Sequence, residues 1–108
     1  MVDLAGTTGP DEVTRRVAHH LAGLAGQPPR LLHGFGYRSA AWSRPATVAE
    51  LDAVTGDVPA ILTSGDAHNG WLNTAALGLL GVSGVTGPLD ETDWFALQPV
   101  ISALLEEV

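Results

Sequence analysis

Five side chains that could contact a ligand stand close together in the middle of this chain. They are Asp66, His68, Asn69, Trp71 and Asn73. A carboxylate beside an imidazole can orient that ring through a hydrogen bond, and both groups can also bind a polar substrate. We therefore treat these residues as candidates for a substrate-facing site.

A purely structural interpretation of the same residues stays open. Asp66 or Asn69 would then cap the helix that follows, because capping uses these residue types. His68 would in that case be a half-exposed loop residue. Trp71 is expected to pack in the core, and Asn73 to hydrogen-bond the preceding loop.

The expected elements around these residues are a strand, a polar elbow and a helix. Pro59 starts the strand, where its missing N–H is tolerated. The helix is predicted from about Asn69 to Leu80, with Leu79 among its inward residues and Gly81 at its end. Elbows of this kind present side chains and backbone N–H groups to ligands.

Upstream, the pattern predicts a helix, a strand and a second helix. Thr8 is the expected cap of the first helix, and the strand is expected at about residues 30–36. Spacing of four residues predicts ion pairs from Asp11 to Arg15 and from Glu12 to Arg16. A capping box over residues 47–50 predicts a short helix that ends near residue 56.

Between these elements, Tyr37, Arg38, Trp42 and Arg44 form an aromatic and cationic loop. We expect an ordinary surface loop here; the alternative is that an arginine clamps a carboxylate or lies over an aromatic ring.

Downstream, a last helix is predicted with Asp90 as its cap. Pro99 either kinks this helix or starts a new one capped by Gln98. Because two strands do not form a stable sheet unaided, helices must cover them. The sequence therefore predicts a small α+β domain of two layers, a few strands covered by about four helices.

The chain lacks the residues of a complete metal centre. It contains no Lys and no Cys, and its histidines, at positions 19, 20, 33 and 68, form no His-x-His pair. A site made from His33, His68 and Asp66 is conceivable only if the strands adjoin. We predict no catalytic residue, no metal ligand and no cofactor within this chain.

Length and charge bound the remaining possibilities. The chain has 108 residues, enough for one domain, and a formal net charge of −7. Nucleic acid and anionic membrane surfaces would repel it, so neither is an expected partner. With no apolar run long enough to span a bilayer and no signal peptide, a cytoplasmic location is expected.

The elbow and its surroundings resemble a segment of metal-dependent amidohydrolases of amidohydrolase family 3, which includes N-substituted formamide deformylase, a bacterial type of enzyme. Members typically read Asp-Gly-His followed by Ala or Ser and then Trp-Val-Asn-Ser-Ala-Ala-Leu. The resemblance spans about residues 2–82. The positions that match are Asp66, His68, Trp71, Asn73, Ala75, Ala76 and Leu77, with residues 2–4, 47–54, 57–59 and Trp42.

Two positions depart from the family pattern. The family has Gly-Trp-Asp where this chain has Gly36, Tyr37 and Arg38, so the role of that acid is absent. Ala67 replaces the elbow glycine, which makes an unusual backbone angle there less expected.

The resemblance implies that the chain, residues 1–108, is a single inserted domain that follows the first metal-binding strand of a larger barrel. Zinc or another divalent metal would belong to the parent barrel, which needs about 250 residues. That parent would hydrolyse amide, formamide or cyclic amide bonds, and this segment would face the substrate without transferring protons. The remainder of the barrel, or a second copy of the chain, is the expected partner.

Two other functions stay open. A stand-alone interaction module would use its apolar C-terminal stripe for self-association. A small hydrolase built on Asp66 and His68 would lack an evident nucleophile, because Ser64 stands in no nucleophile-elbow pattern.

Overall fold

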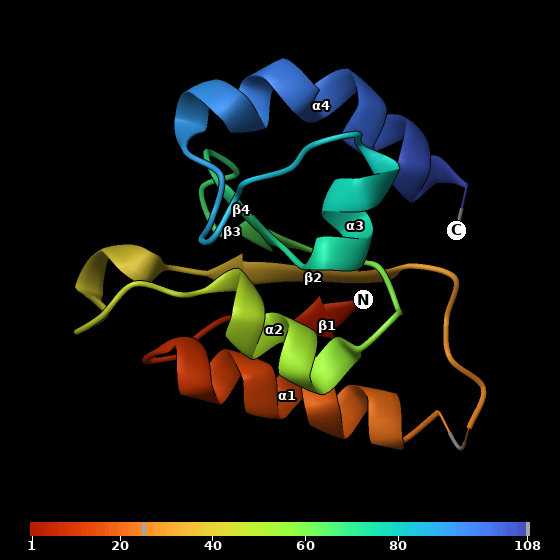
Figure 1. Ribbon diagram of the computed structural model, residues 1–108. Coiled ribbons are helices and arrows are strands. Elements are labelled where there is room, and N and C mark those ends of the chain that lie inside the picture. The colour runs from red at the N-terminus through yellow and green to blue at the C-terminus, as the bar shows by residue number, and fades with distance from the viewer. Residues whose placement is uncertain (25, 108) are drawn as a thin grey trace.

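The computed structural model describes residues 1–24 and 26–107, and over these it shows a four-stranded mixed sheet covered by helices (Figure 1). The strands run in the spatial order β1, β2, β3, β4; the first three are parallel, and β4 is antiparallel to β3. The strands are β1 (Val2–Asp3), β2 (Leu32–Tyr37), β3 (Ala60–Ser64) and β4 (Gly70–Leu72). The helices are α1 (Pro10–Ala22), α2 (Val48–Thr55), α3 (Thr74–Leu79) and α4 (Glu91–Glu106), with a 3-10 turn at Ser39–Ala41.

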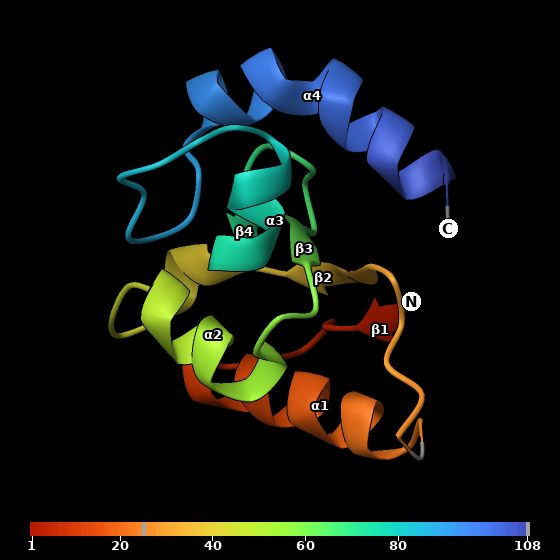
Figure 2. The ribbon, with the colours of Figure 1, turned by 45° about the vertical axis from the view of Figure 1, so that its right-hand side comes forward.

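The helices divide between the two faces of the sheet, with α1 and α2 on one face and α3 and α4 on the other (Figures 1 and 2). Each face has its own apolar cluster. Neighbouring residues of a strand point to opposite faces, so Leu62 joins the cluster under α1 and α2, whereas Ile61 joins the one under α3 and α4. The predicted α+β class, a few strands covered by about four helices, is confirmed; helices on both faces add a layer to the expected two.

The two predicted strands are present as β2 and β3, and every residue of β3 is buried. Sequence prediction missed the other two strands. In β1, Val2 lies opposite Gly34 of β2, and in β4, Trp71 lies opposite Leu62 of β3. Strands of two and three residues are too short to give a periodic signal.

The N-cap of the first helix lies one residue after the predicted one. Gly9, not Thr8, is the N-cap, and Pro10 occupies the first turn. Thr8 instead donates from its hydroxyl to Glu12 Oε1 at 3.2 Å. Glu12 also forms the predicted pair with Arg16, at 3.5 Å.

The predicted Asp11–Arg15 pair is absent, because Asp11 contacts Arg44 from the loop before α2. Arg44 also donates to both carboxylate oxygens of Glu50, at 3.0 and 2.8 Å. Arg44 therefore clamps a carboxylate, the alternative left open for this loop. The predicted capping box is confirmed, with the Thr47 hydroxyl accepting from Glu50 N at 3.2 Å.

The helix predicted from about Asn69 is wrong in its first third. Residues 70–72 form β4, and α3 begins only at Thr74, with Asn73 as the N-cap that accepts from Ala76 N at 2.9 Å. Leu79, predicted to point inward, is 55% exposed. The elbow is therefore the turn of a β-hairpin, and periodicity alone did not separate the short buried strand from a helical turn.

The last helix starts as predicted, with Asp90 Oδ1 accepting from Asp93 N at 2.8 Å. A single helix then continues through Pro99, so the alternative of a second helix capped by Gln98 is wrong. Buried Trp94, near one end of α4, and Ile101, further along, anchor it to the sheet.

Candidate functional site

The candidate site lies where two parallel strands end. β2 ends at Tyr37 and β3 at Ser64, and these two residues are paired in the sheet after a local register shift. Ligands of parallel sheets characteristically bind outside the carboxyl ends of the strands. The loop of residues 65–69, which joins β3 to β4, lies at this edge.

Hydrogen bonds within the loop fix the Asp66 carboxylate. Its Oδ1 accepts from the Ser64 hydroxyl at 2.7 Å and from His68 N–H at 3.0 Å, and Asn69 N–H donates back to Ser64 Oγ at 3.2 Å. The Ser64 hydroxyl, followed by the His68 N–H, lowers the pKa of Asp66 because both bonds favour the charged form. Within the described part of the chain, Asp66 Oδ2 accepts no hydrogen bond.

Ala67 adopts the backbone angle that its side chain disfavours. Its φ is 63°, and its N–H donates to Ser64 O at 3.0 Å, closing the turn. The expectation of an ordinary backbone angle at this position is wrong. The elbow requires the left-handed conformation, which costs an L-residue roughly 1–2 kcal/mol.

His68 does not pair with Asp66 through its ring, so the hypothesis of a carboxylate-oriented imidazole is wrong for these two residues. The ring Nδ1 lies 3.4 Å from Glu91 Oε1, and the ring packs edge-on against Phe95 with 5.5 Å between centroids. Trp94 adds a third contact by donating from its indole to Ala67 O at 2.8 Å. The first five residues of α4 therefore hold the hairpin loop.

Tyr37 holds the loop through a hydrogen bond to Asn69. It is fully buried, and its hydroxyl donates to Asn69 Oδ1 at 2.6 Å. Burial, and then the charge of Asp66, raise the pKa of Tyr37, so that the phenol stays protonated and remains a donor. Rings of Trp42 and Trp71 pack around it at 5.5 and 6.4 Å.

Trp71 and Asn73 do not join the other three candidates. Trp71 is fully buried, as its predicted packing role requires, and its indole donates to Thr47 O at 3.0 Å. Asn73 is also fully buried. Its amide accepts from Ala60 N and Ala76 N, each at 2.9 Å, and donates to Thr55 Oγ1 and Val58 O, each at 2.7 Å.

The structure thus brings Asp66 and Asn69 to one cavity, whereas the ring of His68, from the same loop, contacts α4. We call this cavity the strand-end hollow; its volume is about 210 Å³. It is lined by Tyr37, Arg38, Ser39, Ala40, Ser64, Asp66 and Asn69.

Sequence reasoning missed Arg38 and Ser64 as members of this site. Both residues stand at or just after the ends of β2 and β3, which are parallel neighbours. Arg38 lies across the backbone of Gly65, where an added Cβ would approach its Nε to 3.1 Å. A glycine at position 65 therefore allows the guanidinium to lie close to the loop.

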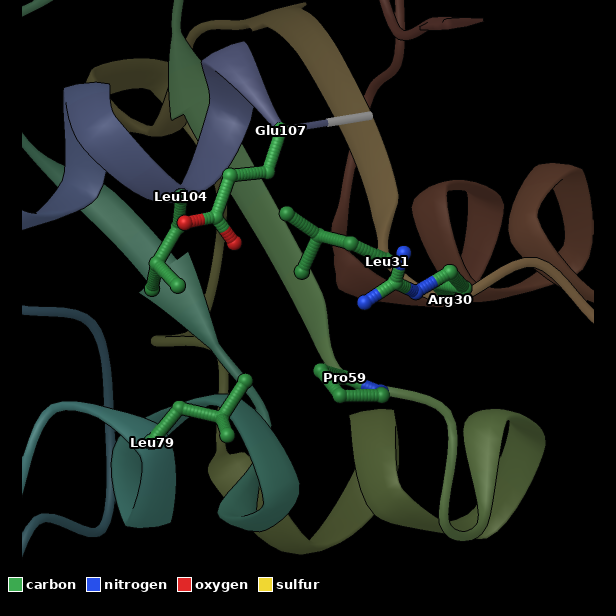
Figure 3. A pocket seen from close by; sticks show the side chains of 6 residues that line it. All are labelled: Arg30, Leu31, Pro59, Leu79, Leu104 and Glu107. Carbon is green, nitrogen blue, oxygen red and sulfur yellow. The ribbon is translucent and has the colours of Figure 1, made fainter.

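A second cavity, of about 240 Å³, opens at the opposite ends of the strands (Figure 3). Arg30 and Leu31 precede β2, and Pro59 precedes β3, so this cavity adjoins the amino ends of the strands. Leu104 and Glu107 line it from the end of the chain. It contains none of the five candidate residues, and its lining is mostly apolar.

No three His, Asp or Glu residues within residues 1–24 and 26–107 are placed to hold a metal ion. The conceivable site from His33, His68 and Asp66 is therefore not formed. His33 lies within β2, where its Nε2 is 3.4 Å from Thr63 Oγ1. The same described residues contain no helix long and apolar enough to cross a membrane.

No protein-family model matches the sequence, and no curated protein matches it. Two solved structures do. One is an uncharacterized metal-dependent hydrolase from Pyrococcus horikoshii OT3, with 25% identity and a TM-score of 0.73 over 94% of this chain and 20% of that chain. The other is an uncharacterized metal-dependent hydrolase from Pyrococcus furiosus, with 25% identity and a TM-score of 0.71 over 94% of this chain and 21% of that chain. This chain is therefore similar, in fold and in sequence, to about one fifth of a metal-dependent hydrolase.

Proposed function

We propose that this chain is an inserted domain of a metal-dependent amidohydrolase that cleaves carbon–nitrogen bonds other than peptide bonds. The observation that carries the proposal is the similarity of 94% of the chain to about one fifth of two metal-dependent hydrolases. The sequence resemblance to amidohydrolases supports the narrower reaction class. In this role the substrates are amides, formamides or cyclic amides.

In such an enzyme, this domain and the barrel would have different roles. The barrel would hold a divalent metal, zinc or a similar ion, which activates water for attack on the amide carbon. The described residues offer no cluster that fits such an ion, so we place no step of the reaction on them. Asp66, His68 and Asn69 would instead contact the substrate at the mouth of the barrel.

The genomic reading frame around this segment provides the first test. We expect a His-x-His strand encoded upstream, and Lys, His, His and Asp ligands encoded downstream. The product of the complete reading frame, loaded with zinc, should hydrolyse N-benzylformamide, an uncharged formamide. The 108-residue chain alone should neither retain stoichiometric zinc nor turn over this substrate. A zinc-loaded, active 108-residue chain, or flanking sequence without these ligands, would overturn the proposal.

Self-association is the second candidate function, and exposed apolar side chains on α4 favour it. Phe95 is 47% exposed and Val100 is 48% exposed. Light scattering over a range of concentrations separates the two: a tight symmetric dimer supports the interaction module, and a monomer supports the inserted domain.

A further inference from the structure

We propose that the strand-end hollow binds a small ligand that presents a carboxylate to Arg38 and an N–H group to Asp66. An N-acylated amino acid has this pattern. The inference rests on the proposed function in one respect, because an amide hydrolase supplies the reason for an amide-bearing ligand; the binding itself needs no metal.

Arg38 is the cation of this site. Its side chain is exposed, and it forms no ion pair with any of the residues that the structure describes. By contrast, Arg16 and Arg44 are both paired with acids. A guanidinium binds a carboxylate through two parallel N–H bonds, which makes Arg38 a suitable partner for an anionic group.

Asp66 supplies the complementary group. Its Oδ1 is occupied by the Ser64 hydroxyl and the His68 N–H, whereas its Oδ2 is not engaged within the described part of the chain. These two bonds hold the carboxylate in one orientation before a ligand arrives. Asp66 and Arg38 line the same hollow without bonding to each other, so one ligand can contact both.

Asn69 adds a further polar group. Its Oδ1 accepts from Tyr37, and this bond assigns the amide orientation and leaves Nδ2 available as a donor. The volume of the hollow, about 210 Å³, corresponds to roughly seven water-sized groups of about 30 Å³ each. That space is enough for a group of amino-acid size.

The test is an NMR titration of the 108-residue chain with three probes: N-acetylglycine, N-methylacetamide and acetate. N-acetylglycine should shift the backbone amide signals of residues 37–40 and 64–69 with saturation. It should bind at least roughly tenfold more tightly than either N-methylacetamide or acetate, because each of these lacks one half of the recognition pattern. Equal affinity for N-acetylglycine and N-methylacetamide would overturn the assignment of Arg38.

Two arginine variants sharpen the test. Arg38→Gln keeps a polar side chain of similar length and should weaken N-acetylglycine binding roughly tenfold or more. Arg15→Gln is the matched control, because Arg15 is also exposed and unpaired among the described residues. If the two variants bind alike, or if the wild-type signals of residues 37–40 and 64–69 do not move, the inference fails.

The inference and the proposed function can fail separately. Hydrolysis of N-benzylformamide by the complete enzyme, together with no binding of N-acetylglycine to this chain, sinks the inference alone. Binding of N-acetylglycine with its loss in Arg38→Gln, together with no C–N hydrolysis by the complete enzyme, sinks the proposed function alone.

Discussion

Two polar clusters lie at opposite ends of β3, and they differ in how many of their groups are occupied. At the amino end, Asn73 is fully buried and uses both amide atoms for four hydrogen bonds within the protein. At the carboxyl end, Asp66 and Arg38 are exposed, and each keeps a group without a partner in the described residues. The first cluster therefore uses its polar groups to hold the fold together, whereas the second leaves polar groups unused by the described residues.

Removing the Asn73 amide should have the largest effect on stability. Asn73→Ala leaves the N–H groups of Ala60 and Ala76, and the oxygens of Thr55 and Val58, without their partner. Each buried unsatisfied group costs about 1–3 kcal/mol, so we expect a loss of about 3 kcal/mol or more in the free energy of unfolding. Urea denaturation followed by circular dichroism measures this.

Asn69→Ala is the matched control at the other cluster. It removes one side-chain bond, that from Tyr37, and should cost about 1 kcal/mol. Equal losses in the two variants would contradict the proposed contrast between a structural cluster and a binding cluster.

Gly70→Ala should have the next largest effect on stability, because it disturbs the packing that joins α4 to the hairpin. A Cβ at position 70 would lie 2.1 Å from Trp94 Cζ3, so the indole must move. Overpacking of this kind costs about 1–3 kcal/mol. Gly78→Ala in α3 is the control, since a Cβ there meets nothing within 4 Å and favours helix. A change in Trp fluorescence with the same stability as wild type would show that α4 adapts without cost.

Ala67→Gly, in the loop at the carboxyl end of β3, should raise the free energy of unfolding by about 1 kcal/mol. The substitution relieves the positive φ of 63° without removing any hydrogen bond of the loop. Thermal unfolding should show a raised melting temperature. Ala53→Gly, on the exposed face of α2, should shift the melting temperature in the opposite direction, because glycine weakens a helix interior. If both substitutions lower it, the loop is not strained at position 67.

His33 should produce the smallest effect, a pH dependence of stability. Burial, and then the positive amino terminus, lower the pKa of His33 from 6.5. Below pH 6.5 the unfolded chain therefore binds more protons than the folded one, so stability falls as pH drops from 6.5 towards the lower folded pKa and is restored above 6.5.

The urea midpoint at about pH 5.5 and about pH 7.5 tests this. His33→Gln should reduce the difference between the two midpoints, whereas His19→Gln, on the exposed side of α1, should preserve it. An unchanged difference in His33→Gln would assign the pH dependence to other groups.

Much of the fold follows from local sequence signals. The capping box at Thr47 and the cap at Asp90 each rest on residues within one turn of helix, and both are confirmed. The helix predicted from Asn69 fails because Trp71 and Leu72 are buried by pairing with β3, a tertiary contact that apolar periodicity does not encode.

The candidate site was predicted in part. Asp66, His68 and Asn69 stand together because they belong to one loop, which the chain order alone reveals. Arg38 joins them only through the parallel pairing of β2 and β3, and His68 meets Glu91 only through the docking of α4. These contacts join residues more than twenty positions apart, which a single sequence does not bring together.

Met1 and Leu105 line one cavity of about 340 Å³, so residue 1 and the last turns of α4 are neighbours. A domain whose two ends lie side by side can be inserted into a surface turn of a larger protein without separating the elements on either side of that turn.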